Sequence, residues 1–166
     1  RKFTMKVELR NRKIFVDSNA FIYFLTGQAN DLTCEIFNMA ALGQTKVITS
    51  TRVVDEVLFK LICLEASRKF GFTSNIPKKL RESKEKVKSL SYVYDVLFQF
   101  MEDINAQVLT VDTSVIAKSK KVIDTYGLFG NDAITVTLMK SRNLKYILTA
   151  DKDFSVVSDI VVINPL

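Results

Sequence analysis

Short runs of apolar residues alternate with longer amphipathic stretches along this chain of 166 residues. The short runs are rich in Val and Ile, which favours buried strands, and the stretches between them repeat apolar residues at helical spacing. The clearest stripe runs from Leu90 to Ile104, and a second runs from Val53 to Ile62 behind Ser50 or Thr51 as a helix cap. We predict five strands, at Lys13 to Asp17, Lys46 to Ser50, Gln107 to Asp112, Lys145 to Ala150 and Ile160 to Ile163.

One segment carries conflicting signals. Residues 134–138 alternate apolar and polar side chains, a pattern that is typical of a strand. The preceding Gly130, Asn131 and Asp132 offer a cap and an acid in a first helical turn. A parallel strand at Lys145 also requires a crossover before it, so we predict a helix here.

Strands that alternate with helices predict a parallel sheet with helices on both faces. The length is typical of one domain, and no repeat or linker divides the chain, so we expect a single α/β domain over residues 1–166. Residues 1–12 would form an N-terminal extension, and residues 70–89 a helical arm that interrupts the alternation of strands and helices.

The composition is that of an ordinary globular protein, with 48% hydrophobic and 25% charged residues. No apolar run approaches the roughly 20 residues that cross a bilayer. No signal peptide is visible, although the chain begins at Arg1 and Met5 offers one native start. We therefore expect a cytoplasmic protein without a membrane segment.

Several residue types that support common chemistries are missing. The sequence has no histidine, and its five glycines form neither GxxxxGK nor GxGxxG. Catalytic triads, HExxH zinc sites and any imidazole acid or base are thereby excluded, and a glycine loop for nucleotides is disfavoured. Catalysis would have to come from carboxylates, lysines, hydroxyls or a bound ion.

A net charge of +6 favours a polyanionic partner, because Lys and Arg displace counterions from phosphates. Much of this charge lies in the arm, where residues 78–88 hold six basic and two acidic side chains. The arm is either a solvated helical segment or a basic lip over a substrate groove, and the two readings are compatible. Lys78, Lys79 and Arg81 are the candidate contacts to the polyanion.

Four acids should meet at one edge of the predicted sheet. Asp17 closes the first strand and Asp151 the fourth, and ligands bind at the carboxyl ends of parallel strands. Asp132 begins the helix that leads into the fourth strand, and Glu56 lies just inside the helix after the second. Asp55 borders the same apolar stripe as Glu56, and periodicity alone does not choose between the two.

Each acid also has an ordinary structural role open to it. Asp17 or Asp151 could cap the following helix, Asp132 could interact with a helix dipole, and Glu56 could be a solvated border residue. Four unrelated capping roles need not converge, however. Carboxylates packed together without Lys or Arg partners repel one another, and a divalent cation relieves that repulsion. All-oxygen ligation selects Mg²⁺ or Mn²⁺, and a basic protein with such a pocket suits phosphodiester cleavage.

These segments resemble the four motifs of the PIN-domain ribonucleases, in order. Asp17-Ser18-Asn19 followed by apolar residues is similar to the first motif, and residues 55–58 to the second, which favours Glu56 as the motif acid. Residues 131–133 resemble the third motif and residues 148–154 the fourth. Each motif is short, but the ordered set spans Ile14 to Asn164 and is fairly specific.

The resemblance implies a three-layer α/β/α sandwich with a central five-stranded parallel sheet, and a ribonuclease dependent on Mg²⁺ or Mn²⁺. By analogy Asp17 would be the shared metal ligand, Asp132 and Asp151 would complete one or two metal sites, and Glu56 would hold the attacking water. Hydrogen bonds from neighbouring side chains would orient these acids. The supporting residues would be Ser18, Asn19, Thr149 and Asp153; direct ligation by Asp153 stays open, and Ser18 and Asn19 could equally be helix caps.

Within the family the chain looks like the VapC-type toxins of prokaryotic toxin–antitoxin pairs. That implies single-stranded RNA as substrate, an antitoxin partner and a homodimer. The extension and the long arm depart from compact toxins, so an RNA-processing nuclease stays open. Two further alternatives are a non-catalytic PIN-like module that binds RNA or protein, and a haloacid-dehalogenase-like phosphatase, which would carry a second Asp where Asn19 stands.

Overall fold

The central sheet has five parallel strands in the order β3-β2-β1-β4-β5. The structure is a computed structural model that describes residues 8–166. The strands are β1 (Lys13–Val16), β2 (Lys46–Ser50), β3 (Gln107–Leu109), β4 (Tyr146–Leu148) and β5 (Val161–Ile163). All five predicted strands are confirmed, and β3 and β4 end earlier than expected because the residues after them turn toward other partners.

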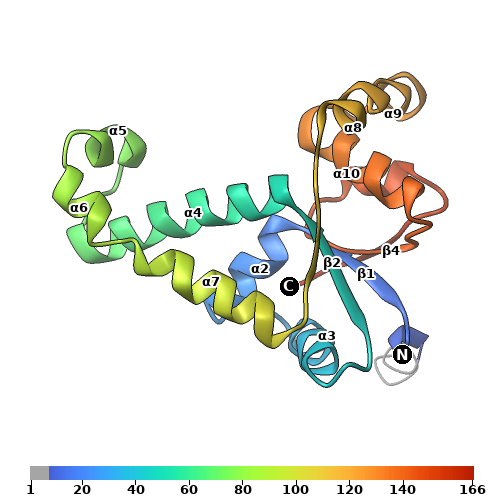
Figure 1. Cartoon of the computed structure of the whole chain (residues 1–166), viewed down its shortest axis with the longest axis horizontal. Helices are drawn as coiled ribbons and strands as arrows, with labels where there is room; N and C mark the ends of the chain where they lie inside the picture. The colour runs from blue at the N-terminus through green and yellow to red at the C-terminus, as the bar shows by residue number, and fades with distance from the viewer. Residues whose placement is uncertain (1–7) are drawn as a thin grey trace.

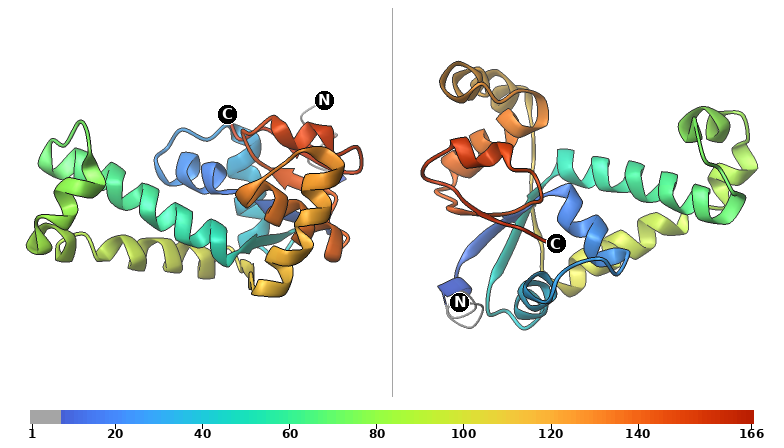
Figure 2. Two further views of the ribbon diagram at one scale, coloured as in Figure 1. Left: turned by 90° about the horizontal axis from the view of Figure 1, so that it is seen from above. Right: turned by 180° about the vertical axis from the view of Figure 1, so that it is seen from behind.

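Helices connect the strands and cover both faces of the sheet (Figures 1 and 2). Right-handed crossovers place the helices before β3 on one face and those after it on the other. The three-layer α/β/α sandwich is thus confirmed. The first face carries α2 (Ser18–Leu25), α3 (Asp31–Ala41), α4 (Thr51–Phe70) and α7 (Tyr92–Asp103), and the second α8 (Thr113–Lys118), α9 (Lys120–Tyr126), α10 (Gly130–Ser141) and the short 3-10 helix η1 (Asp153–Val156).

Two helix starts show how the sequence sets these boundaries. Ser50 caps α4 by accepting a hydrogen bond from the amide of Val53, at 3.2 Å. The ambiguous segment 134–138 is helical, as predicted, within α10. The cap expected there is wrong: α10 begins at Gly130, so Phe129 stands at the N-cap without a side-chain cap and Asn131 lies inside the first turn, where its side chain bonds to Glu56.

The core lies on both sides of β1. Ile14, Phe15 and Val16 are each 0% exposed, as befits the central strand of a sheet covered on both faces. Phe21 and Phe37 from α2 and α3 pack with Phe100 of α7 in an aromatic cluster on the first face. This packing fixes the position of α2, whose first residues follow Asp17 directly.

The arm at residues 70–89 projects from the domain (Figure 1). It contains α5 (Ile76–Arg81) and α6 (Lys84–Lys88), held at the far ends of α4 and α7 by a separate small core of Ala66, Leu80 and Leu90. Residues 1–7 of the predicted extension lie outside the described residues. Within residues 8–166, no helix combines the length and the apolarity that a membrane crossing would require.

Candidate active site

The four predicted acids lie at the carboxyl edge of the sheet. Asp17 follows β1 and Asp151 follows β4, which are neighbouring parallel strands. Glu56 lies in the second turn of α4, and Asp132 in the first turn of α10. The placement follows from topology, since helices that leave a parallel sheet begin at the edge where the strands end.

Asp17 is the most buried of these acids, with 8% of its surface exposed. Its Oδ1 accepts a hydrogen bond from the amide of Ser18 at 2.7 Å, so it also caps α2. Its Oδ2 accepts from Thr149 Oγ1 at 2.7 Å and from Asn19 Nδ2 at 3.0 Å. Burial raises the pKa of Asp17, and the hydrogen bonds from Thr149 and from the Ser18 amide offset only part of that rise. A carboxylate has about four lone-pair positions, so three donors still leave room for a further ligand.

Asn19 and Thr149 connect the ends of β1 and β4. Asn19 Nδ2 donates to Thr149 Oγ1 at 3.1 Å, and Asn19 Oδ1 accepts from the amide of Ala150 at 2.9 Å. Thr149 Oγ1 also accepts from the amide of Asp151 at 3.1 Å, and Thr149 is completely buried. Together these bonds hold the Asp151 backbone beside Asp17.

Glu56 is held by three donors from three helices. Ser18 Oγ donates to its Oε1 at 2.9 Å, Asn131 Nδ2 donates to its Oε2 at 3.0 Å, and Lys60 one turn along α4 forms an ion pair with it. Burial raises the pKa of Glu56, but the hydrogen bonds from Lys60 and Ser18 outweigh it, and the net shift is downward. Glu56 is therefore ionised at neutral pH. Asp55, the alternative acid, instead points outward to Arg52.

Three carboxylates of the site can reach a common point. One carboxylate oxygen each from Asp132, Asp151 and Asp153 lie within 4.8 Å of one another. The amide of Asp153 donates to Asp151 Oδ1 at 2.9 Å, which folds the loop after β4 back on itself. Asp153, expected in a supporting role, thus stands in the same group as Asp132 and Asp151, whereas Asp17 lies outside that group.

The pKa of Asp132 is raised by burial and by its position among these acids. Burial, followed by the negative charges of its acidic neighbours, raises its pKa from 3.8 to about 6. The neighbours that contribute are Asp151, Asp17, Asp153 and Glu56. Each of these four acids therefore lies close enough to Asp132 to disfavour its negative charge.

The donor set fits a divalent cation. It consists of carboxylate oxygens alone, which is the chemistry of Mg²⁺ and Mn²⁺ rather than of zinc or copper. The separation within the group suits ligands of one ion, and burial together with the neighbouring acids raises the pKa of Asp132, a cost that a bound cation would relieve. Asp132, Asp151 and Asp153 are thus the residues that could hold the ion, with Asp17 next to them.

The structure adds two residues, Lys60 and Asn131, to which the sequence analysis gave no contact with the acids. Lys60 neutralises Glu56, contrary to the expectation that the acids lack basic partners; its i, i+4 spacing from Glu56 was the available signal. Asn131 lies inside the third motif, donates to Glu56, and leaves its buried Oδ1 without a partner within residues 8–166. No pattern in the sequence predicts that contact.

The arm does not overhang the acids. Glu56 and Phe70 are 14 residues apart on one straight helix, which corresponds to about 21 Å. Lys78, Lys79 and Arg81 lie on α5, which packs against the second half of α4 through Leu80 and Ala66, and Lys79 Nζ sits 5.3 Å from the Phe72 ring centre. The arm is therefore not positioned to form a lip over the acids. A contact between the arm and a more distant part of a long polyanion remains a prediction.

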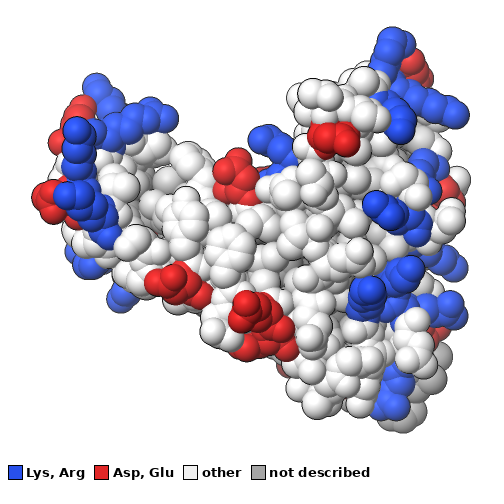
Figure 3. Space-filling model, viewed as in Figure 1, with Lys and Arg blue, Asp and Glu red and all other residues white. Residues whose placement is uncertain are grey.

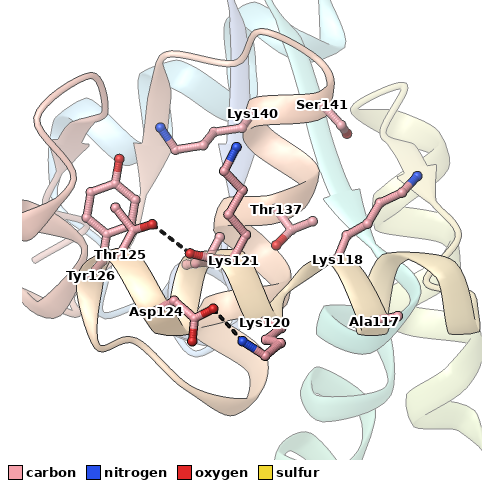
Figure 4. A pocket seen from close by; sticks show the side chains of 11 residues that line it. Ala117, Lys118, Lys120, Lys121, Asp124, Thr125, Tyr126, Thr137, Lys140 and Ser141 are labelled. Carbon is pink, nitrogen blue, oxygen red and sulfur yellow. Dashed lines mark hydrogen bonds and ion pairs between the residues drawn. The ribbon is translucent and has the colours of Figure 1, made fainter.

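Basic side chains gather over the arm, over α9 and along the side of the molecule below α9 in Figure 3, and both acidic and basic side chains lie at the hollow between the arm and α9. Near α9, a hollow of about 760 Å³ separates α8 and α9 from α10 (Figure 4). Lys120 pairs there with Asp124 and Lys140 with Asp159. Two more lysines of this hollow, Lys118 and Lys121, form no ion pair among the described residues.

The ordered acids and the sheet topology define a protein class. The model of the PIN domain family matches residues 14–160, and the chain belongs to this family. It therefore does not belong to the haloacid dehalogenases. The chain is similar to ribonuclease VapC2 of Methanocaldococcus jannaschii, with 27% identity over 161 residues that cover 96% of this chain and 98% of the relative.

Solved structures show the same fold. VapBC2 of Rickettsia felis, bound to a DNA fragment from its promoter, aligns with a TM-score of 0.56 and 12% identity, over 92% of this chain and 98% of that chain. A toxin–antitoxin complex of Klebsiella pneumoniae aligns with a TM-score of 0.50 and 17% identity over the same shares. The expected likeness to VapC-type toxins is confirmed at the level of family and fold.

Proposed function

We propose that this chain is a metal-dependent ribonuclease of the VapC type that hydrolyses single-stranded RNA in the cytoplasm. The observation that carries the proposal is the group of Asp132, Asp151 and Asp153, whose carboxylate oxygens lie within 4.8 Å of one another. The relative named ribonuclease VapC2 supports RNA as the substrate. Single strands are favoured because their backbone can bend into a site at a sheet edge.

We assign the metal-holding role to Asp132, Asp151 and Asp17, with Asp153 as a fourth carboxylate close enough to join them. When bound, Mg²⁺ or Mn²⁺ would stabilise negative charge on the phosphoryl oxygens and lower the pKa of a coordinated water. Ser18, Asn19 and Thr149 would keep the acids in place through the hydrogen bonds described above.

Glu56 would orient the attacking water. Its pKa lies below the ordinary value, so it is a carboxylate that accepts a hydrogen bond at neutral pH. Its three donors fix the direction of the remaining lone pairs, which is what a positioning base requires. The nucleophile would then be water rather than the ribose 2′-hydroxyl, and the products would carry a 5′-phosphate and a 3′-hydroxyl.

The proposed partners include an antitoxin and a second copy of the chain. The two solved structures that share the fold are toxin–antitoxin complexes, which supports the first. Several large apolar side chains stand exposed on α4 and α7, which supports a protein-covered face there. They are Phe59, Leu64, Tyr92, Tyr94, Val96 and Phe98.

The test is cleavage of an end-labelled RNA by wild type and by Asp17→Asn, with Mg²⁺ or Mn²⁺ and with EDTA. Wild type should cut only with metal, and the near-isosteric variant should not cut. Cutting that survives in EDTA or in the variant would refute the assignment of these acids. RNA binding without cutting under every metal condition would favour the non-catalytic PIN module instead.

A further inference from the structure

One aromatic ring stands in solvent at the start of α10, the helix that carries Asp132. Phe129 is 79% exposed, the largest value among the exposed large apolar side chains of residues 8–166. Its neighbour Leu128 is only 6% exposed, so the chain leaves the core and presents the ring to solvent within one residue. The backbone is extended at Phe129, and Gly130 then takes a positive φ of 60° to start α10.

Phe129 belongs to the same helix start as two residues of the site. It is the N-cap of α10, three residues before Asp132, whose carboxylate belongs to the three-acid group. Asn131, two residues on, donates to Glu56. The ring is therefore attached to the same helical turn that supplies one proposed metal ligand and one support of the proposed base. No capping bond or buried contact explains a phenylalanine at this position.

We propose that Phe129 is a stacking platform for a nucleobase beside the scissile phosphate. The inference rests on the proposed ribonuclease function. Proteins that bind single-stranded RNA commonly stack exposed aromatic rings on unpaired bases, which tolerates many sequences because every base has a flat face. An acidic metal site repels the RNA backbone until the ion is in place. A lysine beside the acids would form ion pairs with them and would not be free to bind RNA. An uncharged aromatic ring beside the acids would add affinity for RNA without forming such pairs.

The chain has no tryptophan, which allows a direct measurement. Phe129→Trp in the inert Asp17→Asn background would carry a single indole at the proposed stacking position. Its fluorescence should be quenched when RNA is added, and an RNA with an abasic nucleotide at the stacked position should quench less. The matched control is Leu42→Trp, an exposed residue at the end of α3 on the opposite edge of the sheet, whose fluorescence should not change.

Kinetics give an independent readout. Phe129→Ala should raise KM for RNA by about 5- to 150-fold, the equivalent of about one base stack, while kcat at saturation changes little. Phe129→Tyr should keep KM at the wild-type value and Phe129→Leu should not. The reason is that stacking requires a flat ring, which Tyr has and the apolar Leu lacks. Melting curves should be unchanged, since the side chain is exposed.

The outcomes separate the two levels of inference. Wild type that cuts RNA, together with an Ala variant of unaltered KM and an unquenched indole at position 129, overturns the stacking assignment and leaves the nuclease intact. Phe129→Ala that alters sedimentation but not RNA affinity identifies a protein contact and also overturns it. Wild type that neither cuts nor binds RNA removes the proposed function itself, and the stacking role with it.

Discussion

Replacing Asp132 by Asn should stabilise the metal-free protein. Burial and the charges of its acidic neighbours raise the pKa of Asp132 from 3.8 to about 6, so the folded state prefers the protonated acid. Stability therefore falls as pH rises from about 4 through about 6. The full shift corresponds to about 3 kcal/mol, and solvent screening of this half-exposed carboxylate reduces it to about 1 to 2 kcal/mol. Asn carries no charge and avoids this penalty.

The measurement is thermal unfolding in EDTA between pH 4 and pH 8. For a chain of this length we expect Asp132→Asn to melt about 2 to 8 °C higher than wild type at pH 7, and no higher at pH 4. Asp55→Asn is the matched control, because Asp55 faces Arg52 outside the acid cluster. A gain of equal size at pH 4, or none at pH 7, would refute the repulsion argument.

Four further outcomes are expected. Mn²⁺ at about 100 times its dissociation constant should stabilise wild type by about 2.7 kcal/mol and Asp132→Asn by less, as melting curves will record. Lys60→Met should raise the pKa of Glu56 and move the acidic limb of the kcat/KM profile to higher pH; an unmoved limb would exclude Glu56 as the base. Reversing the charges of Lys78, Lys79 and Arg81 should weaken RNA binding and reduce its dependence on salt concentration, while kcat stays unchanged. Equal salt dependence of RNA binding in the variant and in wild type would exclude an arm contact. Light scattering at micromolar concentration should give the mass of a dimer, and a monomer mass would contradict self-association.

The sheet was predictable because each strand is a short apolar run between helical patterns. The strand ends were less predictable. β4 stops at Leu148 because Thr149 and Asp151 turn into the hydrogen-bond network of the site, which the apolar pattern does not record. β3 stops at Leu109 because Asp112 caps α8. In both places a polar side chain of the predicted strand, Thr149 or Asp112, forms a hydrogen bond outside the sheet.

The site was predictable as far as topology alone determines it. The rule that parallel strands end at one edge brought Asp17 and Asp151 together, and helix starts placed Glu56 and Asp132 nearby. Contacts that depend on the direction of a side chain could not be predicted from the sequence. Asn131 bonding to Glu56 is one, and the closeness of Asp153 to Asp151 is another.

The hydrogen bond from Thr149 to Asp17 joins residues 132 positions apart in the sequence. A ribosome that adds about 5 to 20 residues per second needs about 7 to 26 seconds to pass from one to the other. During that interval a nascent chain carries Asp17, Ser18 and Glu56 but lacks the strand that completes the acid cluster. A chain still being translated therefore lacks Asp151 and Asp153, and the acid cluster can form only after β4 has docked against β1.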